Sequence, residues 1–219
     1  AQMLSSIFDF DAILYDTISS NAPTDLSVEE NLDRDRLLAL LPNVRRLQLN
    51  SFYDIKLVCE LLPAATELCV FDFHPLFDSV DSTCAREFAE GIQHATKLQH
   101  LRIDVMLSSG YKLLHERLLN TIASFPLETL HLHDAAFSSH LYKAVKAISG
   151  TLRSFEFSSS VYDAADLATV LAENCNQLLS LSLKNFVVSE PSQVSRFVAA
   201  VSNLRSLIRF SLDFGKPVS

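Results

Sequence analysis

Two stretches of twelve residues decide the fold: LPNVRRLQLNSF at residues 41–52 and LPAATELCVFDF at residues 62–73. When the two are aligned, every apolar position of the first stretch coincides with an apolar position of the second. The same L-x-x-L-x-L spacing recurs five more times, at Leu98/Leu101/Ile103, Leu127/Leu130/Leu132, Leu152/Phe155/Phe157, Leu178/Leu181/Leu183 and Leu207/Phe210/Leu212. The last copy also fits three residues earlier, with a poorer ending. The second anchors are residues 47, 68, 101, 130, 155, 181 and 210, about 27 residues apart on average. A pattern that repeats at such a period predicts a stack of similar units.

The segments between the copies have a helical period. Apolar residues fall on one helical face in three of them: Cys84/Ala85/Phe88/Ile92/Ala95, Ala164/Leu167/Ala168/Leu171 and Val194/Phe197/Val198/Val201. Each unit is therefore expected to be a short strand followed by a helix. Right-handed β-α units of this length stack into a parallel sheet with the helices outside, so we predict an α/β fold.

Composition excludes several classes of function. The four glycines, at positions 91, 110, 150 and 215, are too far apart for a dinucleotide-binding or phosphate-binding loop. The net charge of −8 argues against a nucleic-acid partner. No apolar run is long enough to span a membrane, and no membrane partner, metal or cofactor is expected. The four cysteines form neither a CxxC motif nor a dense disulfide framework, so we expect buried thiols in a reducing compartment. This favours an intracellular protein, although a secreted one stays open.

The repeat resembles the leucine-rich repeat family over roughly residues 37 to 214. Its irregular spacing is most similar to the cysteine-containing type found in F-box-associated proteins. The resemblance implies a horseshoe-shaped solenoid of about seven repeats, with the parallel sheet on the concave face and helices on the convex face. We expect residues 37–219 to form this domain and residues 1–36 to be an N-terminal cap or a degenerate first repeat. Within that stretch, residues 6–10 are a candidate strand, and residues 25–35 are expected to lead into a helix.

The repeat also predicts which side chains leave the core. In L-x-L the leucines point inward and their neighbours stand on the exposed sheet face. Repeats three to five place six chemically active side chains on one patch of that face: His100, Arg102, Asp104, His131, His133 and Glu156. Asp104 is expected to abut His133.

Three interpretations of this patch stay open. It can be a solvated polar face with ion pairs. It can be a partner-binding surface tuned by histidine protonation. It can also be a metal site in which His131 and His133 are joined by Asp104 or Glu156. We favour the first two and expect no metal, because side chains two residues apart diverge on an open sheet.

Phe71 is a seventh candidate for partner binding. With Leu68 as its repeat's anchor, Phe71 is predicted to face outward as an aromatic contact. The alternative is that it folds over the edge of the short second repeat.

No motif in the sequence supports catalysis. An open sheet face also excludes little of the water that a catalytic site usually keeps out. The predicted function is non-catalytic recognition of a protein partner, whose identity the sequence does not give. By resemblance, this is the substrate-recognition half of an F-box-type ubiquitin ligase; a secreted or host-directed effector is the alternative.

Overall fold

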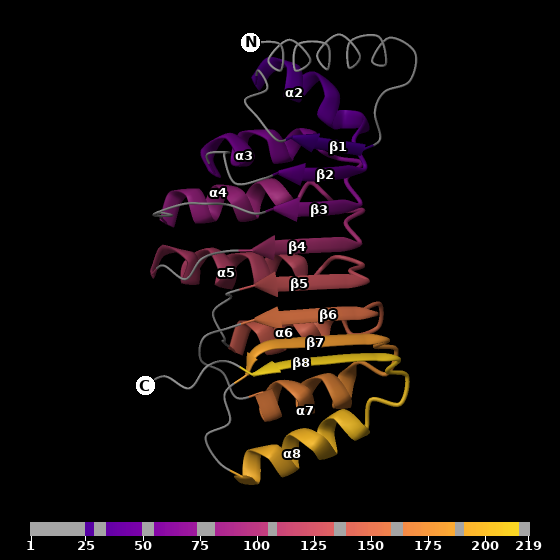
Figure 1. Ribbon diagram of the computed structural model, residues 1–219. Coiled ribbons are helices and arrows are strands. Elements are labelled where there is room, and N and C mark those ends of the chain that lie inside the picture. The colour runs from indigo at the N-terminus through magenta and orange to yellow at the C-terminus, as the bar shows by residue number, and fades with distance from the viewer. Residues whose placement is uncertain are drawn as a thin grey trace, which may run out of the picture.

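Strands and helices alternate along the chain (Figure 1). The computed structural model describes residues 25–28, 34–49, 55–73, 82–104, 109–133, 139–158, 164–186 and 191–214. The strands are β1 (Asp25–Val28), β2 (Arg46–Leu49), β3 (Val70–Phe73), β4 (His100–Asp104), β5 (Thr129–His133), β6 (Ser154–Ser158), β7 (Ser180–Phe186) and β8 (Arg209–Phe214). The α-helices are α2 (Arg34–Leu40), α3 (Ile55–Leu61), α4 (Ser82–Ile92), α5 (Ser109–Ile122), α6 (Ser139–Ile148), α7 (Ala164–Asn174) and α8 (Pro191–Ser202). Single 3₁₀ turns at Leu41–Asn43 and Leu62–Ala64 follow α2 and α3.

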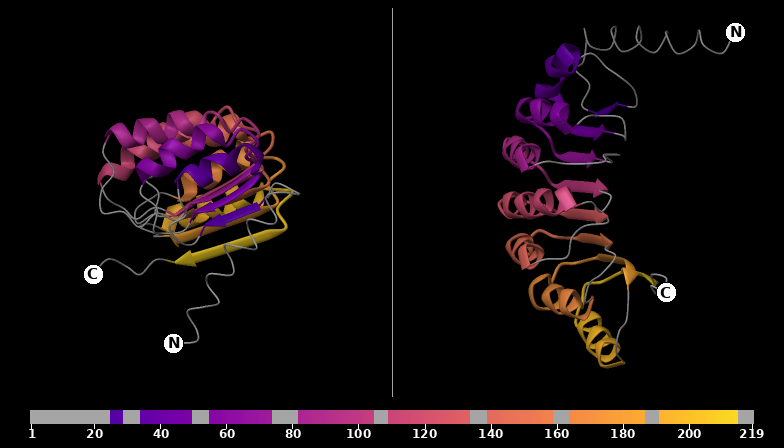
Figure 2. Two further views of the ribbon diagram at one scale, coloured as in Figure 1. Left: turned by 90° about the horizontal axis from the view of Figure 1, so that it is seen from above. Right: turned by 90° about the vertical axis from the view of Figure 1, so that its left-hand side faces the viewer.

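The eight strands form one sheet in chain order, and all seven neighbouring pairs are parallel. The helices form a second layer on one side of the sheet (Figure 2). We call the opposite side of the sheet the polar face. The predicted α/β class and parallel sheet are confirmed.

The core lies between the two layers and runs the length of the stack. Successive strand side chains point to opposite faces, so alternate apolar residues enter the core. These strand anchors are at most 1% exposed from β2 to β7: Leu47, Leu49, Phe71, Phe73, Leu101, Ile103, Leu130, Leu132, Phe155, Phe157, Leu181 and Leu183. Helix residues such as Phe88 and Leu171 close the core from the other side.

The second repeat has a different register from the one that the sequence pattern predicts. Leu47 pairs with Phe71 and Leu49 with Phe73, so Phe71, and not Leu68, is the anchor. The irregular spacings of 21 and 33 residues become 24 and 30.

The expected outward position of Phe71 is therefore wrong. Phe71 is 0% exposed, and its ring centroid lies 5.7 Å from that of Phe73 and 6.3 Å from that of Phe88. Together with the contact between Phe73 and Phe88, these distances define a cluster of three aromatic rings in the core. Phe71 is consequently a core residue and offers no surface to a partner.

The predicted face of α8 is also partly wrong. Phe197, Ala200 and Leu204 are buried, whereas Val194 is 41% and Val198 55% exposed. Val194 and Val198 are exposed because α8 is the last helix of the layer and no described element packs against its outer side. The corresponding face of α4 is buried as predicted, and so are Leu167, Ala168 and Leu171 of α7.

At the N-terminal end, the sheet begins with β1, a strand that the repeat pattern does not predict. Leu26 is buried and lies beside Leu47, so β1 covers the first repeat. The expected helix follows as α2. The candidate strand at residues 6–10 lies outside the described residues.

Candidate functional site

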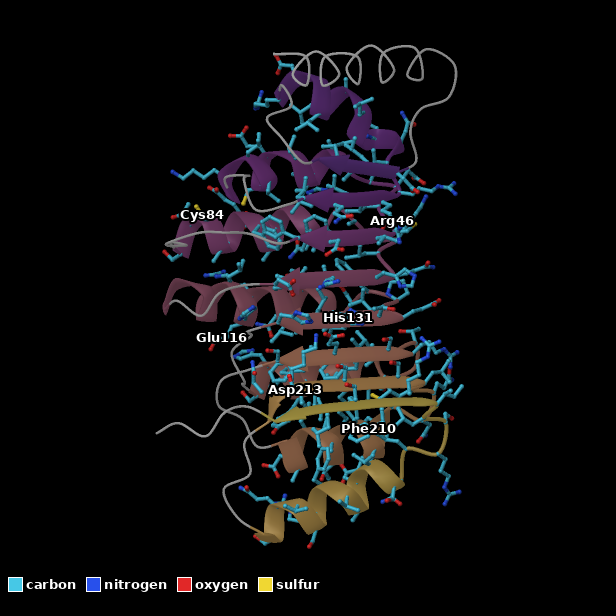
Figure 3. The ribbon with its side chains drawn as sticks, in the orientation of Figure 1. Arg46, Cys84, Glu116, His131, Phe210 and Asp213 are labelled. Carbon is cyan, nitrogen blue, oxygen red and sulfur yellow. The ribbon has the colours of Figure 1, made fainter. Side chains whose placement is uncertain are left out.

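The polar face is built from alternate residues of successive strands. Adjacent strands place equivalent residues about 4.8 Å apart, so each position forms a row across the sheet. The middle row consists of Gln48, Asp72, Arg102, His131, Glu156, Ser182 and Ser211. His131 marks the centre of this face (Figure 3).

Arg102 lies between two carboxylates. Its Nε is 3.8 Å from Oδ1 of Asp72 on β3, and its Nη2 is 3.4 Å from Oδ2 of Asp104 on its own strand. Asp72 occupies this position because of the corrected register of β3. The guanidinium group therefore bridges two strands.

His133 continues the chain of charges from Asp104. Its Nδ1 is 2.6 Å from Oδ1 of Asp104, and its Nε2 is 2.6 Å from Oε1 of Glu156. The same oxygen of Glu156 contacts Nζ of Lys184 on β7. We call Asp72, Arg102, Asp104, His133, Glu156 and Lys184 the ion-pair network. It crosses five strands, β3 to β7, without interruption.

The surroundings shift the pKa values within the network. Hydrogen bonding to Asp104, together with the charges of Asp104 and Glu156, raises the pKa of His133 against the opposing effects of burial and Lys184. For Glu156, burial favours the neutral acid, but the hydrogen bond from Lys184 and the charges of His133 and Lys184 prevail, so its pKa is lowered. With His133 protonated, the network holds three positive and three negative groups.

The pKa of His131 shifts in the opposite direction from that of His133. Burial lowers the pKa of His131 against the opposing charge of Glu156, and the charges of Arg102, His133 and Lys184 act in the same direction as burial. Its Nε2 lies 3.3 Å from Oγ of Ser154. His131 therefore presents a neutral imidazole beside a charged network.

His100 stands at the edge of the patch. Its Nδ1 is 2.9 Å from Oγ1 of Thr129 on the next strand. The structure thus places His100, Arg102, Asp104, His131, His133 and Glu156 on one face, and it joins four of them by ion pairs. The expected neighbourhood of Asp104 and His133 is confirmed.

Sequence reasoning missed two members of the network. Asp72 was missed because the predicted register of the second repeat placed Cys69 in the middle row instead. Lys184 stands in the expected outer row beside Ser158, but its distance from Glu156 depends on the reach of a long side chain. A comparison of all possible registers for VFDF would have exposed Asp72.

The geometry gives no support to a metal site. Among the described residues, no group of three His, Cys, Asp or Glu side chains is arranged to hold a metal ion. Both ring nitrogens of His133 already face carboxylates.

A separate groove lies between α7 and α8, in the helix layer. Its volume is about 790 Å³, and alanines 172, 199 and 200 line it together with Glu173, Arg196 and Arg205. None of its lining residues belongs to the ion-pair network.

Comparisons with known proteins add no family. No protein-family model matches this sequence, and no match was found among curated proteins.

None of the described helices combines the length and the apolar character that a membrane span requires.

Proposed function

We propose that this chain is a leucine-rich repeat protein that recognises a protein partner on its polar face, without catalysis. In this proposal the stack is a horseshoe with the sheet on the concave side and the helices on the convex side. The separation of the strand layer and the helix layer in Figure 2 supports this arrangement. The repeat spacing becomes more regular after correction of β3, which supports the family assignment.

The observation that carries the proposal is the ion-pair network. Its charged groups are held by neighbours on adjacent strands, and the carboxylate and imidazole side chains are 17–28% exposed. Side chains that are already ordered lose little conformational entropy when a partner binds. Fixed charges of alternating sign also select a complementary surface and disfavour others. The network is therefore suited to specificity.

The resemblance to F-box-associated repeats gives the proposal its most specific form. In that form the polar face selects a substrate for ubiquitin transfer by other subunits. Fold alone does not establish this role. It requires that a captured partner becomes ubiquitinated in the presence of this chain.

Affinity capture with the full chain tests the proposal. The test variant reverses two network charges, Arg102→Glu and Glu156→Arg. The matched control reverses the ion pair between Arg196 and Asp166, which joins α8 to α7 in the helix layer. We expect a specific partner to be lost with the network variant and kept with the control. A partner retained by both variants, or lost only with the control, contradicts recognition by the polar face.

A further inference from the structure

Within the part of the chain that the structure describes, β8 is the outermost strand at the C-terminal end of the sheet. It pairs with β7 on one side, and no described strand pairs with the other. Figure 1 places β8 at the end of the sheet, with α8 beyond it at the end of the helix layer. An exposed strand edge carries unpaired N–H and C=O groups and is a template for another strand.

A repeated hydrogen-bond motif defines what is missing at this edge. Before each strand, one carbonyl oxygen accepts two N–H groups from the start of the next strand, at 2.8–3.0 Å. The six acceptors are Arg45, Cys69, Gln99, Glu128, Arg153 and Leu179. The next residue of the series is Ile208, and no described residue donates to its carbonyl. The vacant site thus has the geometry that a parallel strand would fill.

The exposure of apolar residues on β8 also indicates that a further strand would fit at this edge. Phe210 is 46% exposed, whereas Leu181, its partner on β7, is 1% exposed. Ile208 is 78% exposed, and Val194 and Val198 of α8 are exposed as well. In the inner repeats, the following strand covers the equivalent anchors. An added strand with alternating apolar residues would cover Phe210 and Leu212 in the same way.

Two opposite charges flank this site on the polar face. Arg209 and Asp213 are both exposed, lie four residues apart on β8, and form no ion pair with a described residue. Figure 3 labels Phe210 and Asp213 on this strand. In a parallel strand, the residue beside Arg209 would best be acidic and the one beside Asp213 basic.

We propose that the free edge of β8 binds a strand of a partner protein, parallel to β8, with the sequence pattern acidic–apolar–any–apolar–basic. The two apolar residues cover Phe210 and Leu212. The acidic residue lies beside Arg209 and donates its backbone N–H to the carbonyl of Ile208. Main-chain hydrogen bonds hold the strand, and the two charges set its direction.

Two labelled peptides test the proposal with the full chain, by fluorescence anisotropy. The peptide SEVSVKS has the required pattern, and SKVSVES has its charges exchanged. We expect the first to bind on the order of tenfold more tightly, because two favourable cross-strand pairs replace two repulsive ones. N-methylation of the glutamate amide should abolish this binding.

A double variant, Arg209→Glu with Asp213→Lys, should reverse the preference of the two peptides. Arg46→Glu changes an exposed arginine at the far end of the same face and should leave the preference unchanged. The proposal is overturned if neither peptide binds at millimolar concentration, if the wild-type chain prefers SKVSVES, or if the double variant keeps the original preference. It is also overturned if sedimentation shows that a second copy of the chain occupies this edge.

Discussion

Nδ1 of His133 lies 2.6 Å from Oδ1 of Asp104, on the adjacent strand. This contact joins the two halves of the ion-pair network, with Arg102 and Asp72 on one side and Glu156 and Lys184 on the other. A histidine at such a junction changes the charge of the whole surface when it gains or loses a proton.

The two histidines of β5 should titrate on opposite sides of the usual value. Asp104 raises the pKa of His133, and burial lowers that of His131. NMR titration of the ring protons measures both, and Asp104→Asn should lower the pKa of His133. Since this pKa is higher in the folded than in the unfolded chain, its stabilising effect is present below pH 6.5 and lost as pH rises through the folded value. Identical titration of the two rings would refute the described network.

His115 on α5 should make the chain sensitive to acid. It is 1% exposed, and burial lowers its pKa to about 4. A lowered pKa stabilises the fold above the unfolded value near 6.5, and this contribution, about 3 kcal/mol, is lost as pH falls toward 4. His115→Leu should therefore flatten the fall of unfolding free energy over this range. An unchanged pH slope, measured by urea denaturation, would assign the acid sensitivity to other groups.

Phe71→Ala should destabilise the protein by about 3–5 kcal/mol, because it opens a cavity among stacked rings. Phe71→Leu, which keeps most of the volume, should cost about 1 kcal/mol. Chemical denaturation measures both. If Phe71→Ala unfolds like the wild type but binds its partner weakly, the assignment of Phe71 to the core is wrong.

The repeat pattern predicted β2 and the strands from β4 to β7 because each contains a single frame of alternating apolar residues. It also predicted β8, although a second, poorer frame fits three residues earlier. It failed at β3 because ELCVFDF contains two such frames, Leu68/Val70 and Phe71/Phe73. Packing against Phe88 of α4 accompanies the second frame, and a sequence pattern does not reveal that long-range contact. The error moved Phe71 to the surface and concealed Asp72.

The candidate site, like the fold, was predictable only in part. Strand periodicity was sufficient to place Asp104 beside His133. The choice of His133 over His131 as the link to Glu156 depends on side-chain conformations and on Lys184. The exposed outer side of α8 was missed, since a helical pattern does not indicate whether a neighbouring element covers that side.

Asn185 is a test of the local geometry of β7. It has a φ of 58°, next to a register shift between β7 and β8, and its Nδ2 donates to Oγ of Ser158 at 3.2 Å. Asn185→Ala should cost about 1–2 kcal/mol more than Asn185→Gly, because only glycine adopts this conformation without strain. Both variants lose the side-chain hydrogen bond, so their difference in melting temperature isolates the backbone effect. Equal stability of the two would argue against a left-handed residue here.

The central claim is that the polar face itself contacts a protein partner. The most direct measurement is photo-crosslinking from a single site on that face, with a benzophenone amino acid in place of Ser182. Ser182 lies in the middle row between Glu156 and Ser211. The control places the same group at Lys146, which is exposed on α6. We predict that the partner is crosslinked from position 182 and not from position 146. Crosslinking from position 146 alone would place the binding surface on the helices and contradict the proposed function.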